Sequence, residues 1–161
     1  MIKCQLTADE LGITPADIYD QMGYGSNLPD PMTVRETEAM LEETLKIIHP
    51  LFCFFISDGT LDETGHILSV MGQDFSIGRI ISLQLRKSER YAFFVATAGT
   101  EFEEFQHQLA AQNDMVRIYI ADAIGSVIAE KAADKMEQEL ERLLLPAGWH
   151  HTNRFSPGYC G

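Results

Sequence analysis

Residues 114–145 carry apolar side chains at helical spacing over many turns, and no other feature of the sequence constrains the fold as strongly. The apolar positions run from Val116 to Leu144 at intervals of three and four, which is typical of an amphipathic helix. The first half is small and apolar around Gly125, so a neighbouring backbone can approach closely, and the second half is charged. We expect one long C-terminal helix here, ended by the Pro-Ala-Gly step at 146–148.

Shorter elements precede this helix. Alternation predicts a short strand at residues 2–6, and further strands are predicted at 51–56, 66–71 and 91–96, of which those at 51–56 and 91–96 are apolar and buried. Capping signals followed by helical periodicity predict helices at 14–22, 33–49 and 100–109, whereas 76–85 fits either a helix or a strand. The triplet Asp58-Gly59-Thr60 is typical of a turn.

One junction in this order combines a strand end, a tight turn and a helix start. The strand at 91–96 leads into Thr97-Ala98-Gly99-Thr100, and the acidic amphipathic helix begins there. Such a junction is a common place for the edge of a ligand site.

The charge balance limits the classes of partner. The chain has 161 residues, of which 45% are hydrophobic, with 12 Lys and Arg against 24 Asp and Glu, giving a formal charge of -12. Such a chain is long enough to bury a core, and we expect one domain over residues 1–161. Its charge repels phosphate backbones and anionic lipid, so no nucleic acid and no membrane is expected as a partner.

The cysteines and the N-terminus bear on the compartment. Cys4, Cys53 and Cys160 are an odd number at wide spacing, without a C-x-x-C pair. Residues before position 20 lack a basic stretch followed by an apolar core, and no apolar run approaches the roughly 18 residues that span a bilayer. We expect a reduced, cytoplasmic protein.

The final segment, from Arg154 to Tyr159, holds the most informative residues. An arginine fork can bind a carboxylate through two hydrogen bonds, a Pro-Gly step exposes backbone amides, and a tyrosine face attracts a cation. These groups suit a zwitterion with an additional positive centre. From spacing alone, an ordinary Pro-Gly turn with a surface arginine and a packed tyrosine is the better interpretation.

The segment Arg154-Phe155-Ser156-Pro157-Gly158-Tyr159 resembles the Arg-x-x-x-Gly-Tyr motif of the activation (reactivation) domains of cobalamin-dependent methionine synthases. Three further stretches resemble stand-alone members of that family. They are the short helix ending in Gly-Tyr at 17–24, the apolar strand closing in a Thr-x-Gly turn at 93–99, and the small-residue helix bearing a glutamate at 121–130. The four stretches occur in the family's order over nearly the whole chain.

The resemblance implies a fold and an activity. The fold is α+β, a twisted and mainly antiparallel sheet packed with helices. The family reaction is reductive remethylation of an inactivated corrinoid, a methyltransferase reactivation. It uses S-adenosylmethionine as methyl donor, cobalamin carried by a corrinoid-binding protein or methyltransferase partner, and an electron from a reduced flavoprotein. In this family the domain positions the methyl donor, and the reactivity of the corrinoid cofactor accounts for the methyl transfer. No catalytic residue is therefore singled out.

The resemblance also implies ligand residues. Arg154 would hold the carboxylate of S-adenosylmethionine, with Ser156 and Gly158 lending backbone contacts. Tyr159 would lie near the sulfonium or the adenosine, and Glu130 is the glutamate of the small-residue helix.

Two departures from the family pattern stand out. Ser126 occupies the position where the synthase domain places a glutamate on its ligand, and the family continues well beyond the Gly-Tyr step, whereas this sequence stops at Gly161. The chain is therefore expected to be either a C-terminally truncated fragment or a pared-down relative.

The histidines and the last cysteine are poorly arranged in the sequence to bind a metal ion. His150 and His151 are adjacent, so their side chains diverge, and no acid or cysteine joins them at ligand spacing. Cys160 is more typical of a small packed or terminal residue than of a reactive thiol. We expect no metal site.

Two other functions stay open. The chain could be a non-catalytic accessory protein that docks on a corrinoid methyltransferase without binding S-adenosylmethionine, which Ser126 and the early stop favour. It could also be an interaction domain that has kept the fold and lost the ligand, since a fold does not fix a function.

Overall fold

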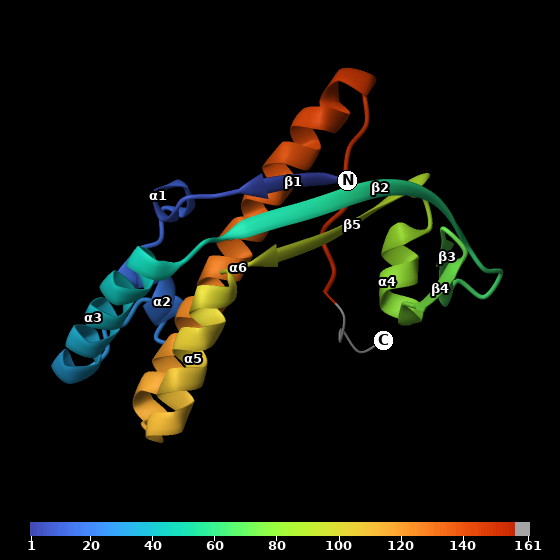
Figure 1. Cartoon of the computed structure of the whole chain (residues 1–161). Coiled ribbons are helices and arrows are strands. Elements are labelled where there is room, and N and C mark those ends of the chain that lie inside the picture. Colours follow the sequence, from blue (N-terminus) through green and yellow to red (C-terminus); the bar gives the residue numbers. More distant parts are fainter. Residues whose placement is uncertain (157–161) are drawn as a thin grey trace. The chain divides into compact units, whose positions relative to one another are not determined.

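The fold is α+β, as predicted, in a computed structural model that describes residues 1–156. The elements follow in the order β1 (Ile2–Gln5), α1 (Ala8–Leu11), α2 (Pro15–Gln21), α3 (Pro31–Ile47), β2 (Leu51–Leu61), β3 (Ile67–Val70), β4 (Gln73–Ser76), α4 (Gly78–Leu85), β5 (Arg90–Thr97), α5 (Thr100–Gln112) and α6 (Met115–Leu144), with a 3-10 turn at Leu145–Ala147. The long helix α6 is confirmed and runs over 30 residues (Figure 1).

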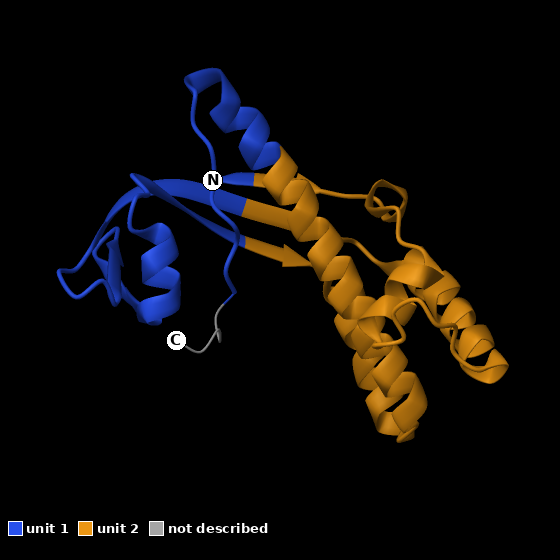
Figure 2. Ribbon diagram, turned by 180° about the vertical axis from the view of Figure 1, so that it is seen from behind, with its two compact units in different colours: residues 1–2, 54–94, 139–161 blue, residues 3–53, 95–138 orange. Residues whose placement is uncertain are grey.

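The strands form one five-stranded sheet. Its order is β1-β2-β3-β4, and β5 also pairs with β2, so the long strand β2 has three neighbours. The β2–β3 and β3–β4 pairs are antiparallel. The chain divides into two compact units, coloured in Figure 2: unit 1 comprises Met1–Ile2, Phe54–Phe94 and the described residues from Glu139 onward, and unit 2 comprises Lys3–Cys53 and Val95–Gln138. That residues 1–161 form a single domain stays a prediction.

Unit 1 is built on the hairpin of β2 and β3. Its core contains Leu68, Val70 and Tyr91, with Phe93 packed against them. Gly59 lies opposite Val70 in the ladder, and a Cβ atom on Gly59 would lie 2.6 Å from the Val70 Cγ2 atom. The strand therefore accepts only glycine at this point without rearranging its neighbour.

The turn between β2 and β3 is organised by one carboxylate. Asp62 accepts hydrogen bonds from the backbone N–H groups of His66 (2.8 Å) and Ile67 (2.9 Å) and from the Thr64 hydroxyl. Gly65 at φ +72° completes the turn, because glycine adopts this conformation without steric cost. The side chain of Asp62 thus takes the place of backbone partners in the reversal.

Unit 2 is mainly helical. Both short helices begin with a capping box, Thr7 with Glu10 on α1 and Thr14 with Asp17 on α2, which satisfies backbone donors that a helix start leaves free. Helix α6 buries one side, and Ile120, Ile124 and Ile128 are each 0% exposed. Helix α5 buries Phe102, Phe105 and Leu109. Long helices can bury this much apolar surface only by packing against one another.

Several boundaries differ from the predictions. The predicted turn at 58–60 is wrong, because β2 continues through it to Leu61 and the chain reverses after Asp62. The helix predicted at 33–49 begins earlier than expected. Helix α3 begins at Pro31, and Asp30 caps it by accepting from the N–H groups of Met32 and Thr33.

The segment at 76–85, which fits either a helix or a strand in the sequence, is a helix, α4, with Ile77 at its N-cap. Strands β2 and β5 are not buried throughout: in β2 the buried residues are Phe52 and Phe54, and in β5 the buried residue is Tyr91. Within residues 1–156, no helix combines the length and the apolar character needed to cross a bilayer.

Candidate functional site

The turn after β5 is shaped by Thr97 and Gly99. The Gly99 N–H donates to the Thr97 Oγ1 at 3.2 Å, and the His49 N–H donates to the Ala98 carbonyl at 3.2 Å. Gly99 has φ +101°, and a Cβ atom there would lie 2.8 Å from the His49 carbonyl oxygen. Only glycine therefore fits where the turn passes the segment before β2.

Helix α6 packs closely against α5 at Gly125. A Cβ atom on Gly125 would lie 2.5 Å from the Phe102 ring, and Phe102 is 4% exposed. The small residue lets the two helices α5 and α6 approach, as the pattern around Gly125 predicts.

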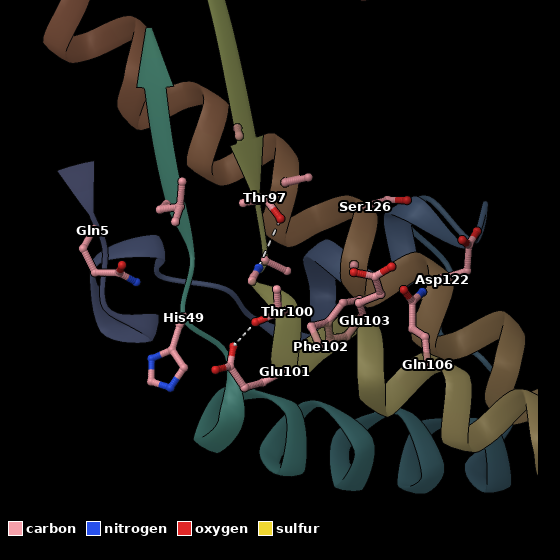
Figure 3. Close-up of a pocket in the computed structure, with 16 residues that line it drawn as sticks. Gln5, His49, Thr97, Thr100, Glu101, Phe102, Glu103, Gln106, Asp122 and Ser126 are labelled. Atoms are coloured by element: carbon pink, nitrogen blue, oxygen red, sulfur yellow. Dashed lines mark hydrogen bonds between the residues drawn. The ribbon is translucent and has the colours of Figure 1, made fainter. Parts of the chain in front are cut away.

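A groove of about 720 Å³ lies where this turn, the first turns of α5 and the small-residue face of α6 meet within unit 2 (Figure 3). It is lined by Gln5, His49, Leu51, Ala96, Thr97, Ala98, Gly99, Thr100, Glu101, Phe102, Glu103, Gln106, Asp122, Gly125, Ser126 and Ala129. This volume is typical of small-molecule sites. The junction at 97–100, expected to border a ligand site, does border a groove.

The lining of the groove is acidic. Glu101, Glu103 and Asp122 contribute carboxylates, and no lysine or arginine is among its lining residues. Glu101 accepts from the Thr100 hydroxyl at 3.2 Å. Helix α5 begins at Thr100, and its N-cap residue, Gly99, has no side chain that could accept from the backbone N–H groups of the first turn.

A smaller hollow of about 320 Å³ lies elsewhere on unit 2 and is lined by Glu130, Lys131, Asp17 and neighbouring residues of α2 and α6. Lys131 forms an ion pair with Asp17 at 3.0 Å. Burial raises the pKa of Asp17, but hydrogen bonds from Thr14 and the nearby Lys131 outweigh burial, and the pKa lies below its usual range. This pair ties α2 to α6.

The predicted ligand residues fall in different parts of the chain. Arg154 is half-buried and Ser156 is exposed, and both belong to unit 1. Glu130 is exposed in unit 2, where it lines the smaller hollow and not the large groove. Gly158 and Tyr159 lie outside the described residues. The ligand roles of all five stay predictions.

Ser126, the position where the resemblance places an acid, lines the large groove. In residues 1–156, no three His, Cys, Asp or Glu side chains cluster closely enough to hold a metal ion. Cys4 and Cys53 are free thiols, each partly buried.

Comparison with known proteins gives a match of structure alone. No protein family model matches this sequence, and no curated protein matches it. Among solved structures, the fold matches the crystal structure of the MetH reactivation domain bound to AdoHcy, with a TM-score of 0.58 over 88% of this chain and 12% sequence identity. This chain shares the fold of that reactivation domain. It spans 55% of the length of the matched chain.

Sequence reasoning missed several residues of the groove. His49, Glu103 and Asp122 come from three separated segments, and each resembles an ordinary exposed residue in its own helix or loop. Two signals were available, the turn at 97–100 and the small-residue stretch around Gly125 and Ser126, and both line the groove without indicating what else faces it.

Proposed function

We propose that this chain binds S-adenosylmethionine and assists the reductive remethylation of a corrinoid cofactor, carried by a methionine synthase or a related corrinoid methyltransferase. The observation that most supports this proposal is a shared fold. Across 88% of this chain, the fold matches a reactivation domain solved with AdoHcy, the demethylated product of S-adenosylmethionine. The order of the four motifs in the sequence supports the same activity, because the identities of those residues are an observation independent of the fold.

Such a step requires few acid–base side chains from the protein. A corrinoid carried by the partner would supply the methyl-accepting cobalt and a reduced flavoprotein the electron, and this domain would contribute by holding S-adenosylmethionine, the methyl donor, in position. The corrinoid partner and the flavoprotein belong to the proposal.

The ligand contacts are proposed from the sequence motif. Arg154 pairs with the carboxylate of the ligand, Ser156 and Gly158 offer backbone groups, and Tyr159 lies beside the sulfonium or the adenosine. Glu130 belongs to the same proposed set. A guanidinium is suited to the first role because its two parallel N–H groups match a carboxylate.

Calorimetric titration of the chain with S-adenosylmethionine and with AdoHcy tests the proposal. We expect saturable one-to-one binding of both. Arg154→Ala should weaken each by roughly ten- to a hundred-fold, which corresponds to the loss of a charge-assisted hydrogen bond. Arg86→Ala is the matched control, because it removes an exposed arginine of the same unit and should leave binding unchanged. Absence of binding by the folded wild-type chain would contradict the proposal.

A second candidate is an accessory protein that docks on a corrinoid methyltransferase without binding S-adenosylmethionine. The observation that favours it is Ser126 in the groove lining, where the resemblance places an acid. It predicts co-elution with a cobalamin-loaded methyltransferase module in size-exclusion chromatography, together with a flat calorimetric titration with S-adenosylmethionine. Binding of the ligand by the isolated chain would exclude this candidate.

A further inference from the structure

Helix α4 exposes apolar side chains on the face that unit 1 leaves uncovered. Its other face packs inward, where Ser82 is buried and Leu85 contacts the core of unit 1. On the outer face, Ile80 is 54% exposed and Leu83 is 49% exposed. Residues three apart on a helix are neighbours, so these two side chains form one exposed apolar patch.

Basic side chains flank this patch. Four of the chain's twelve Lys and Arg residues lie within residues 79–90, where Glu89 is the one acid. Arg79 and Arg86 are exposed and form no ion pair with any described residue. They lie four residues before and three residues after Leu83, and Arg86 keeps helical backbone angles, so both flank that side chain. The basic face of α4 consists of Arg79, Ile80, Leu83 and Arg86.

A face of the opposite charge lies at the start of α6 in unit 2. Met115, Val116 and Tyr119 are 73%, 57% and 52% exposed, and Asp114 and Asp122 are exposed beside them. Tyr119 lies three or four residues from Met115, Val116 and Asp122, which places these side chains next to one another. These five residues form the acidic face of α6.

Contacts with other helices hold the acidic face in place and keep it negative. The Tyr119 hydroxyl donates to the Met22 carbonyl at 3.0 Å. Arg117, the base within this segment, forms ion pairs with Glu36 at 3.0 Å and with Glu43 at 3.8 Å. Two carboxylates therefore share one guanidinium, so Arg117 does not neutralise the two aspartates.

The two faces complement one another and not themselves. Two basic faces would repel, as would two acidic faces, whereas a basic face against an acidic face combines opposite charges with apolar contact. A phosphate backbone would pair with the arginines but offers no apolar side chain to Ile80 and Leu83. The partner chemistry that fits α4 is thus present on this chain itself.

We propose that the basic face of α4 in one copy of this chain docks on the acidic face of α6 in a second copy. The inference does not depend on the proposed function. Each face is small, so the association is weak and forms at high protein concentration. It also weakens with salt, because exposed charges are screened.

Sedimentation velocity of the chain over a hundred-fold range of concentration tests the proposal. We expect self-association that grows with concentration. Arg79→Glu and Asp122→Lys should each weaken it by at least roughly ten-fold, since each places like charges in contact. An equimolar mixture of these two variants should associate again, because the reversed charges then face one another. Lys3→Glu, which reverses an exposed base outside both faces, should associate as the wild type does.

Four results would overturn the proposal. The first is a wild-type chain that stays monomeric over the whole range, and the second is self-association that neither variant weakens. The third is a mixture of the two variants that stays as weak as each alone, because the two faces then do not meet. The fourth is binding of the monomeric chain to phosphatidylserine vesicles through Arg79, which would assign α4 to a lipid surface. Circular dichroism melts verify that each variant is folded.

Discussion

Asp62 is a residue whose carboxylate accepts the hydrogen bonds that organise a turn. The Thr64 hydroxyl and the backbone N–H groups of Ile67 and His66 lower its pKa from 3.8 to about 2. Because the pKa in the folded state lies below that of the unfolded chain, the ionised carboxylate stabilises the fold above about pH 4. That stabilisation is lost as the pH falls from about 4 to about 2.

We therefore predict a pH-dependent effect of Asp62→Ala. The difference in unfolding free energy between the wild type and this variant, measured by urea denaturation, should be largest near pH 6 and should shrink as the pH falls towards 2. Glu63→Ala controls for the removal of one acid from the same turn. A difference that is constant over this range would mean that the carboxylate charge has no part in the turn.

Thr44 is a second residue that the packing singles out. Thr37 and Thr44 are each 0% exposed on α3, and neither hydroxyl has a hydrogen-bond partner among the described residues. A buried hydroxyl without a partner costs free energy, because it has lost its water. Thr44→Val keeps the shape and removes the hydroxyl, so it should raise the unfolding free energy by about 1 kcal/mol.

The comparison variant is Thr44→Ser, which keeps the hydroxyl and loses a methyl group. It should lower the unfolding free energy by about 1 kcal/mol, close to the value of one buried methyl group. Chemical denaturation of both variants at one pH provides the measurement. A loss of stability in Thr44→Val would show that the hydroxyl has a partner in solution.

At the scale of elements, strong apolar periodicity was sufficient to predict a helix or a strand from the sequence, and weak periodicity was not. The helices at 14–22, 33–49 and 100–109, the strands at 2–6, 66–71 and 91–96, and the long helix at 114–145 are all present. Two elements were missed. Helix α1 has only four residues, although its capping box at Thr7 and Glu10 was visible, and β4 is exposed along its length and therefore has no apolar alternation.

The turn between β2 and β3 was misplaced for a physical reason. Gly59 was interpreted as a turn residue, but it is glycine because Val70 and Tyr91 occupy the space of a side chain. Close packing and backbone reversal both select glycine, and only the three-dimensional structure distinguishes them. The lining of the groove could not be predicted from the sequence either, because His49, Glu103 and Asp122 come together only after folding.

Gly125 tests whether α5 and α6 need a small residue at their contact. Alanine favours a helix over glycine by about 1 kcal/mol, but overpacking a core costs about 1–3 kcal/mol. The added Cβ would lie 2.5 Å from the ring of Phe102, so we expect Gly125→Ala to lower the unfolding free energy by about 1 kcal/mol.

The neighbouring variant Ser126→Ala isolates helix propensity from packing. Ser126 is only partly buried, and alanine at this position should leave stability unchanged or raise it slightly. Thermal unfolding of the two variants gives the measurement. If Gly125→Ala melts above the wild type, the close approach of the two helices is not required.

For the whole molecule, fold and function are supported to different degrees. The apolar pattern specifies an α+β fold that a reactivation domain shares at 12% identity, because cores tolerate exchange of apolar residues when volume and pattern are kept. Ligand recognition depends on a few polar side chains that the pattern does not fix, and a fold alone does not determine them. The activity therefore has to be tested through binding of S-adenosylmethionine or its product.

The most direct measurement is a nitrogen–proton correlation spectrum of the labelled chain, titrated with AdoHcy. The account predicts saturable shifts of a discrete set of backbone amides, at a stoichiometry of one ligand to one chain. Shifts that fail to saturate at millimolar ligand would contradict the claim that this chain is an S-adenosylmethionine-binding domain.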